Sequence, residues 1–335
     1  MINSYIKGIS YYVPEKIITN SDLEKMMDTT DEWITTRTGI KQRHSVGNQK
    51  LGPADLAVES TKKVLKKTNT NLTDIDFVIF ATSSPDYYVP GSGSLFQAKM
   101  GLQNIGVLDI RQACAGFVYA LSVADQYIKS GMYKNILVIG SEVQTTQLDY
   151  DNEGRGTAII FGDGAASALI KPTKVKNKGI LSSHLHSDGR YIDELGTRAP
   201  SPKIQGLINK KNIDDRDHHI FMNGREVFKH AVKRFPEVIL EGLQYNKIAI
   251  DDVKLVIPHQ ANYRITKAVQ KNLKIDESKV FSNIHKYGNT TAASVGIALS
   301  EAIAENKIND NDIIVLVAFG AGFYWASTII RWHNE

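Results

Sequence analysis

The stretch Val107-Leu108-Asp109-Ile110-Arg111-Gln112-Ala113-Cys114-Ala115-Gly116-Phe117 contains the one cysteine of the 335-residue chain. An apolar, strand-like run ends near Ile110. A helical pattern starts at about Cys114 and continues through Phe117, Leu121, Ala124 and Ile128. The thiol is therefore expected in the first turn of a helix, where the N-terminus favours the thiolate, the nucleophilic form. An inert buried thiol is the competing interpretation, and for a lone cysteine it is the favoured one.

Length and composition indicate an ordinary folded protein with two domains or one duplicated domain. Hydrophobic residues make up 42% of the chain and charged residues 23%, which is typical of soluble globular proteins. A single cysteine excludes a disulfide scaffold and a CxxC metal site, and it fits a reducing compartment.

Charge and hydropathy patterns disfavour nucleic-acid and membrane functions. The net charge is +4 and the pI about 8.8, without a dense Lys/Arg run interleaved with aromatic residues. The N-terminal segment lacks the pattern of a signal peptide. No stretch approaches the roughly 18 apolar residues of a membrane span. We therefore expect a cytoplasmic protein.

A faint internal repeat relates the two parts of the chain. The apolar segment 76–82 has the same form as 254–260, which lies 178 positions later, and 136–140 falls on 314–318 at the same offset. In each half, a helical segment of small residues lies between the two apolar segments. It is 114–128 in the first half and 292–303 in the second. These agreements predict a duplicated α/β architecture whose sheets are covered on both faces.

Two segments outside the repeat have distinct patterns. The polar stretch from Gly196 to His219 shows no clear period and is predicted to be a long surface excursion, a type of segment that is often functional. A helix is predicted from about Gly224, with Val227, Phe228, Ala231 and Val232 on one face. Pro236 is expected to kink or divide this helix.

Three further segments place polar groups at strand ends and helix starts. The predicted strand 255–258 delivers His259 at its carboxyl end, where ligand sites of α/β sheets lie. Asn289 stands in the second half roughly where Cys114 stands in the first. A glycine-rich turn, 318–323, brings backbone N–H groups near a ligand. Taken singly, each has a plainer interpretation: a satisfied strand-end histidine, an N-cap turn or a hairpin.

Together these groups resemble one family, the β-ketoacyl-acyl carrier protein synthase III enzymes, which are condensing enzymes of the thiolase superfamily. The matching motifs occur in family order and span nearly the whole chain. They are Asp31-Glu32-Trp33-Ile34-Thr35-Thr36-Arg37-Thr38-Gly39-Ile40, Ala113-Cys114-Ala115-Gly116-Phe117, Phe161-Gly162-Asp163-Gly164-Ala165, His259-Gln260-Ala261-Asn262 and Gly288-Asn289-Thr290-Thr291-Ala292-Ala293-Ser294.

The resemblance implies a thiolase-like fold in which two βαβαβαββ halves form a layered α-β-α-β-α core. Residues 1–172 would carry the nucleophilic cysteine, and residues 173–335 the histidine and asparagine. The implied catalytic residues are Cys114, His259 and Asn289. Cys114 would take an acyl group from acyl-CoA, with its own N–H and that of Ala321 as the oxyanion hole. His259 and Asn289 would then stabilise the enolate formed when malonyl-acyl carrier protein loses CO2.

The resemblance also implies binding residues and partners, with acyl-CoA as substrate and no metal or redox cofactor. The implied CoA contacts are Thr29, Trp33, Arg37, Arg155 and Asn262. The implied acyl-pocket residues are Val89 and Phe319. The acidic carrier protein would dock on a basic surface formed by Lys229, Arg264, Lys267 and Lys271, among other helix cations such as Lys233 and Arg234. Solvated helix charges are the plainer interpretation of each of these cations. A homodimer is expected, as in the family.

Three departures from the family pattern bear on the acyl group. Arg111 and Gln112 precede the cysteine motif where the family has small residues. Val89 replaces a bulkier residue and leaves room for a longer primer. The excursion 196–219 is longer than in compact members, so it is expected to cap the pocket or alter dimer contacts.

Four other functions compete with this interpretation. A related enzyme that primes a secondary metabolite, or transfers an acyl group without elongation, is the close alternative. A degradative thiolase needs a second active-site cysteine. A hydroxymethylglutaryl-CoA synthase needs a glutamate base beside the cysteine. A catalytically inactive binding scaffold is disfavoured because the cysteine, histidine and asparagine are all present.

Overall fold

The computed structural model describes residues 2–334, and its first sheet belongs to the N-terminal half. The sheet has the strand order β1-β7-β6-β4-β5. Its strands are β1 (Asn3–Tyr12), β4 (Phe77–Ala81), β5 (Gly106–Ile110), β6 (Ile136–Glu142) and β7 (Gly164–Thr173). Strand β4 pairs in parallel with β5 and β6, whereas β7 is antiparallel to β6 and β1. Every residue of β4 and β6 is buried, which explains their uninterrupted apolar runs.

The second sheet repeats this topology. It has the order β11-β12-β13-β8, built from β8 (Gly179–Ser187), β11 (Val253–Pro258), β12 (Ile313–Gly320) and β13 (Tyr324–Arg331). The position equivalent to β5 is reduced to one isolated parallel bridge between Val256 and Val280. The predicted duplication is therefore confirmed, with the fifth strand of the second half shortened to a single residue pair.

The repeat extends to the backbone around the cysteine. The 3-10 turns η2 (Ala113–Ala115) and η7 (Thr291–Ala293) precede the helices α5 (Gly116–Lys129) and α11 (Ser294–Ala304). Each turn opens on a non-glycine residue with positive φ, 44° at Ala113 and 50° at Thr291, which lie 178 positions apart. The thiol thus lies in a 3-10 turn directly before α5. The sequence predicted it in the first turn of the helix itself, which begins two residues later, at Gly116.

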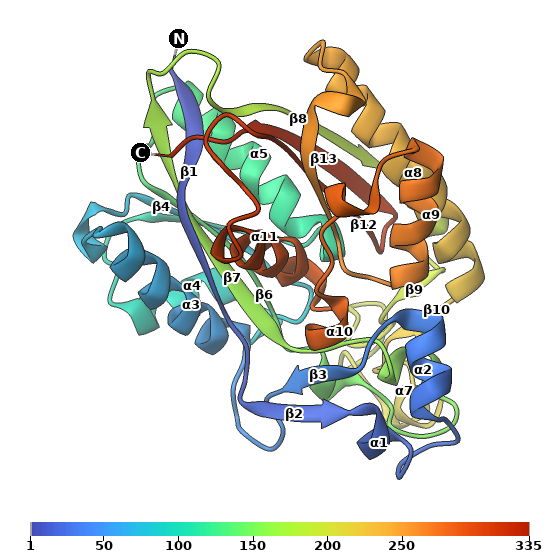
Figure 1. The fold of residues 1–335 in the computed structure, drawn as a ribbon. Coiled ribbons are helices and arrows are strands. Elements are labelled where there is room, and N and C mark those ends of the chain that lie inside the picture. The colour runs from blue at the N-terminus through green and yellow to red at the C-terminus, as the bar shows by residue number, and fades with distance from the viewer. Residues whose placement is uncertain (1, 335) are drawn as a thin grey trace.

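Helices fill the space between the sheets and cover their outer faces (Figure 1). The largest apolar cluster includes residues of both α5 and α11, such as Phe117, Leu121, Val295 and Leu299, which are buried between the sheets. Helices α3 (Pro53–Thr68) and α4 (Ser92–Met100) pack against the first sheet. Helices α8 (Gly224–Tyr245) and α9 (Tyr263–Leu273) pack against the second. This is the predicted α-β-α-β-α layering.

Helix α8 differs from its prediction in two details. Pro236 lies inside the helix without dividing it, because α8 runs continuously from Gly224 to Tyr245. Ala231 is buried as expected, whereas Phe228 remains 36% exposed. No helix within residues 2–334 is long and apolar enough to cross a membrane.

Smaller elements gather at one end of the two halves (Figure 1). They are β2 (Lys16–Thr19), α1 (Asn20–Leu23), α2 (Asp31–Thr38), β3 (Gln42–Ser45), α6 (Arg155–Ala158) and α10 (Ile284–Tyr287). Arg43 is buried beneath them and donates to Asn20 Oδ1 at 2.9 Å and to the backbone oxygen of Ile159 at 2.7 Å. Asn20 in turn donates from Nδ2 to Asp31 Oδ1 of α2 at 2.8 Å. Helices α2 and α6, which carry predicted CoA contacts, are therefore linked through Asn20 and Arg43.

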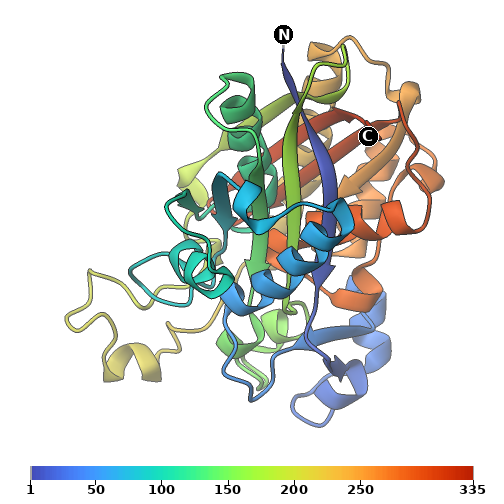
Figure 2. The same cartoon turned by 90° about the vertical axis from the view of Figure 1, so that its left-hand side faces the viewer.

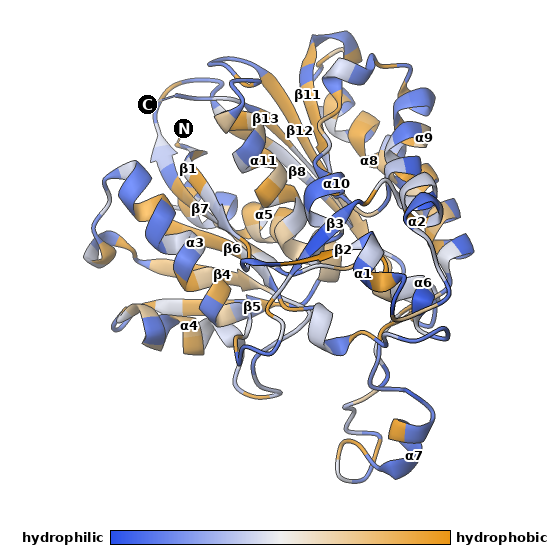
Figure 3. Cartoon of the chain, turned by 60° about the horizontal axis from the view of Figure 1, so that its bottom comes forward, coloured by the Kyte–Doolittle hydropathy of each residue, from blue (hydrophilic) through white to orange (hydrophobic). Residues whose placement is uncertain are grey.

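The polar stretch 196–219 forms an excursion that projects from the body of the protein (Figures 2 and 3). It begins at β9 (Leu195–Gly196), contains the short helix α7 (Lys210–Asp214) and returns at β10 (Phe221–Met222), which pairs with β9. The predicted surface excursion is therefore present, and a single helical turn lies within it.

Candidate active site

The cysteine is held against the end of strand β12. Cys114 is 5% exposed. A Cβ atom built on Gly320 would lie 2.6 Å from the Cβ and 2.9 Å from the Sγ of Cys114. Position 320 therefore has no room for a side chain while Cys114 keeps its position. This close approach explains the glycine-rich turn after the strand.

Burial dominates the electrostatics of the thiol. Burial and the nearby carboxylate of Glu142 raise the pKa of Cys114 to about 12, although the backbone N–H groups of Cys114 and Ala321 act in the opposite direction. The expectation that the helix terminus favours the thiolate is thus outweighed in the free protein. Both N–H groups of the expected oxyanion hole nevertheless face the sulfur.

Strand β11 places His259 at the cavity. The strand ends at Pro258, and the His259 N–H donates to the backbone oxygen of Val317 at 2.8 Å. Gln260 fixes the turn through a 2.8 Å bond from its N–H to Ser294 Oγ. The His259 ring is buried, and neither ring nitrogen has a hydrogen-bond partner among residues 2–334. Burial lowers the pKa of His259 to about 3, so the imidazole is neutral and can donate one N–H.

Asn289 is held by the first half of the chain. Its N–H donates to the Ile160 oxygen at 2.9 Å, and its own oxygen accepts from Gly162 N–H at 3.0 Å. The motif 161–165 thus supplies a short bridge between the halves. Asn289 Oδ1 accepts from Thr291 N–H at 2.8 Å. The side-chain Nδ2 is left as the donor for a ligand.

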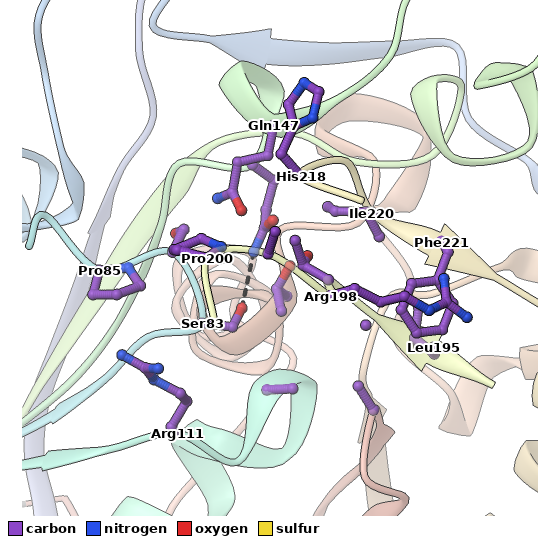
Figure 4. Close-up of a pocket in the computed structure, with 18 of the residues that line it drawn as sticks. Ser83, Pro85, Arg111, Gln147, Leu195, Arg198, Pro200, His218, Ile220 and Phe221 are labelled. Carbon is purple, nitrogen blue, oxygen red and sulfur yellow. Dashed lines mark hydrogen bonds between the residues drawn. The ribbon is translucent and has the colours of Figure 1, made fainter. Parts of the chain in front are cut away.

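Two cavities meet at the thiol. The smaller, about 100 Å3, is lined by Cys114, His259, Asn289, Asn262 and Phe319, among others. The larger, about 1170 Å3, is also lined by Cys114 and Ala321. Figure 4 shows other residues that line it, among them Ser83 and Arg198. The structure therefore brings the three predicted catalytic side chains to one space and gives the thiol a second opening.

The two predicted acyl-pocket residues do not line the larger cavity. Phe319 lines the smaller cavity with His259. Val89 is 79% exposed, and it lines neither of these two cavities. The family resemblance implied both residues for the acyl pocket. Within the single chain the loop carrying Val89 is exposed, so its role in the acyl pocket stays a prediction.

The predicted nucleotide contacts form an aromatic and cationic cluster. The guanidinium carbons of Arg37 and Arg155 lie 4.6 and 5.1 Å from the centre of the Trp33 ring. Thr29 lies on the segment before α2, and its Oγ1 is buried without a hydrogen-bond partner in the described chain. Asn262 caps α9 by accepting from Arg264 N–H at 2.8 Å and also lines the smaller cavity. An aromatic ring close to two guanidinium groups suits a nucleotide base and its phosphates.

The predicted docking cations lie on the adjacent helices α8 and α9. Lys229 pairs with Glu226 at 3.2 Å, and Lys267 with Glu277 at 2.5 Å. Arg264 and Lys271 have no ion pair among residues 2–334 and are exposed. These two unpaired cations remain free for an acidic partner.

The sequence interpretation missed Glu142, the last residue of β6. Its side chain is fully buried and accepts from Ser84 Oγ at 2.7 Å, Gln144 Nε2 at 2.9 Å and Ala292 N–H at 3.3 Å. It therefore ties the second-half turn η7 to the first half beside the cysteine. The available signal was an acidic residue closing an otherwise apolar strand.

A duplicated thiolase-like fold with a cysteine, a histidine and an asparagine on one cavity defines a class, the condensing acyltransferases. Comparison with known proteins identifies the family. Residues 108–189 match the family described as 3-oxoacyl-[acyl-carrier-protein (ACP)] synthase III, and residues 243–332 match its C-terminal counterpart.

Individual relatives agree along the whole chain. The β-ketoacyl-[acyl-carrier-protein] synthase III of Caldanaerobacter subterraneus subsp. tengcongensis is 43% identical, with 98% of this chain and 97% of the relative covered. That of Clostridioides difficile is 41% identical, with 98% of each chain covered. The crystal structure of the Aquifex aeolicus enzyme superposes with a TM-score of 0.89 at 39% identity, covering 98% of this chain and all of that one. The chain belongs to the β-ketoacyl-acyl carrier protein synthase III family and is an acyltransferase.

Proposed function

We propose that the protein condenses an acyl-CoA primer with malonyl-acyl carrier protein and so initiates fatty acid synthesis. The observation that supports this proposal most directly is the position of Cys114 between two cavities, one with two hydrogen-bond donors and one large enough for an acyl chain. No resident metal or redox cofactor is required by this chemistry.

In the first half-reaction, the sulfur of Cys114 attacks the thioester carbonyl of acyl-CoA. The bond from that carbon to the CoA sulfur breaks, and CoA leaves as a thiol with the proton from Cys114. The N–H groups of Cys114 and Ala321 stabilise the oxyanion of the tetrahedral intermediate. Because the resting thiol is neutral, its proton must leave as the carbon–sulfur bond forms.

In the second half-reaction, malonyl-acyl carrier protein replaces CoA. The bond to the carboxylate breaks, CO2 leaves, and the electron pair forms an enolate on the thioester. His259 and Asn289 donate hydrogen bonds to the enolate oxygen. The enolate carbon attacks the acyl carbonyl, and the Cys114 sulfur leaves as a thiolate. The thiolate takes up one proton from water to restore the neutral thiol, and β-ketoacyl-acyl carrier protein is released.

The reaction is tested with malonyl-acyl carrier protein and a panel of acyl-CoAs of increasing length and branching. We expect β-ketoacyl-acyl carrier protein from at least one primer, detected by mass spectrometry of the carrier protein. Acyl transfer without elongation, or elongation only of an unusual primer, would instead indicate the related enzyme of secondary metabolism. No acyl adduct with any primer would contradict the proposal.

We propose that Trp33, Arg37, Arg155 and Asn262 bind the CoA moiety and that the carrier protein docks on α8 and α9. Reversing one unpaired cation, Arg264→Glu, is expected to raise the KM for malonyl-acyl carrier protein while acyl transfer from acyl-CoA to Cys114 stays unchanged. Charge reversal weakens steered association of an acidic partner. An unchanged KM would remove Arg264 from the docking surface.

We also propose that the protein is a cytoplasmic homodimer. Strand β5 has β4 as its one neighbour in the sheet, which leaves an edge for a second copy. Nearby, Tyr87, Tyr88 and Val89 are 55%, 47% and 79% exposed, an apolar loop suited to a protein contact. Sedimentation equilibrium of the full chain measures the assembly directly, and a monomer would contradict this part of the proposal.

A further inference from the structure

Arg216 in the excursion adopts a backbone conformation that favours glycine. It follows the C-cap residue of α7, Asp215, and has φ of 61°. A residue in this left-handed position is most often glycine, because a Cβ atom is unfavourable there. The conformation is held by bonds from Arg216 N–H to Ile213 O at 3.1 Å and from Asp217 N–H to Asn212 O at 2.9 Å. An arginine at such a site points to a use for its side chain.

The Arg216 guanidinium reaches a loop of the N-terminal half. Its Nη1 pairs with the carboxylates of Asp149 and Asp151, and its Nε lies 3.2 Å from Glu153 Oε2. These three carboxylates have no other cation within ion-pair distance among residues 2–334. One positive charge thus holds together three negative charges that would otherwise repel one another.

The same loop contacts the predicted nucleotide site on its other side. Asn152 Oδ1 accepts from Asp28 N–H at 2.6 Å. Arg155 donates to the Asp28 backbone oxygen and lies over the Trp33 ring. Asp151 also accepts from the N–H groups of Glu153 at 2.8 Å and of Gly154 at 3.1 Å, which shapes the backbone just before Arg155.

The excursion also forms a wall of the larger cavity (Figure 4). Arg198 lies 3.8 Å from the centre of the Phe221 ring. The Asp217 backbone oxygen, next to Arg216, accepts from the N–H groups of Arg198 and Ala199 at 3.0 Å. A single arginine therefore connects the wall of the cavity beside Cys114 with the loop that carries Arg155.

We propose that Arg216 is a positioning residue that ties the excursion to the loop 149–155 and thereby sets Arg155 and Trp33 for binding of the CoA nucleotide. The inference rests on the proposed function. Without the guanidinium, three unneutralised carboxylates remain beside a site that must receive phosphates. Their repulsion disfavours both the loop conformation and the ligand.

The test uses Arg216→Gly in the full-length protein, which removes the guanidinium and relieves the backbone strain together. Binding of free coenzyme A is measured by calorimetry. We expect the Kd, and the KM for acyl-CoA, to rise by about fivefold or more, while kcat stays within about twofold.

Lys211→Ala is the matched control. It removes one positive charge from the same excursion, but Lys211 pairs with Asp215 and not with the loop 149–155. Adding Asp149→Asn to Arg216→Gly is expected to restore part of the CoA affinity, because it removes one of the repelling charges. If Arg216→Gly does not fold, Arg216→Gln decides, since it removes the charge and keeps a polar side chain. A raised Kd then supports the proposal.

Three results would overturn the assignment of Arg216. They are a wild-type Kd and KM in Arg216→Gly, an equal loss in Lys211→Ala, or a wild-type Kd in Arg216→Gln when the glycine variant does not fold. A different result would overturn the proposed function instead: wild-type protein that binds no coenzyme A and forms no acyl adduct. The two failures are therefore distinguishable.

Discussion

Cys114→Ser is expected to lower the condensation rate by about 10⁴-fold or more, a loss comparable with removal of a nucleophile in other covalent enzymes. The serine hydroxyl is a far weaker nucleophile than a thiol. Burial lowers the pKa of His259 to about 3, so the neutral imidazole is only a weak base for activating that hydroxyl. Intact-protein mass spectrometry after incubation with single acyl-CoAs measures the first step. Wild-type protein should gain the mass of the acyl group, and the variant should not.

Two measurements distinguish loss of the nucleophile from a folding defect in Cys114→Ser. Serine differs from cysteine in one side-chain atom, so the variant should retain the wild-type circular dichroism and bind coenzyme A with the wild-type Kd. An acyl adduct that persists in Cys114→Ser would place the nucleophile elsewhere. A wild-type protein that forms no adduct with any chain length would contradict the acyl-enzyme mechanism itself.

His259→Ala is expected to separate the two half-reactions. The acyl adduct on Cys114 should still form, whereas condensation with malonyl-acyl carrier protein should fall by about 10²- to 10³-fold, the usual loss of one oxyanion donor. The reason is that His259 is assigned to the enolate oxygen and not to activation of the thiol. Quenched-flow measurement of adduct formation and of CO2 release distinguishes the steps.

The pH dependence gives an independent check on His259. Its pKa is lowered from 6.5 to about 3, so the ring becomes charged only below that pH and stays neutral from pH 5 to 8. The rate of condensation should show no inflection from this group in that range. His184→Ala, at a histidine paired with Glu241 away from the cavity, is the matched control and should keep wild-type rates. Loss of adduct formation in His259→Ala would instead make His259 the base for Cys114.

Local sequence was sufficient to predict the fold. The apolar strands and the helix after Cys114 depend on side-chain periodicity within short windows, and the offset of 178 residues related one half to the other. The same offset relates Ala113 to Thr291, whose matching positive φ values were not visible in the sequence. The motif order also named the family and the three residues that line the smaller cavity.

The sequence did not predict properties that depend on residues far apart in the chain, such as the pKa of a buried group or the contacts of the excursion. The pKa of Cys114 is set by burial under β12 and by Glu142, and these outweigh the helix terminus that the sequence emphasised. The role of Val89 in the acyl pocket stays a prediction, because its loop faces solvent in the single chain. The excursion 196–219 was recognised as polar, but its contacts through Arg216 were not predictable.

The sequence by itself determined the duplicated α/β architecture, the family and the identity of Cys114, His259 and Asn289 as candidates, because each is encoded by a short pattern. Only the tertiary structure decided that the thiol rests neutral, that it separates two cavities and that Arg216 joins the excursion to the loop before Arg155. The physical reason is the separation along the chain of the residues that determine each property. Periodicity acts within a few residues, whereas desolvation and charge pairing depend on groups that lie far apart in the chain and meet only after folding.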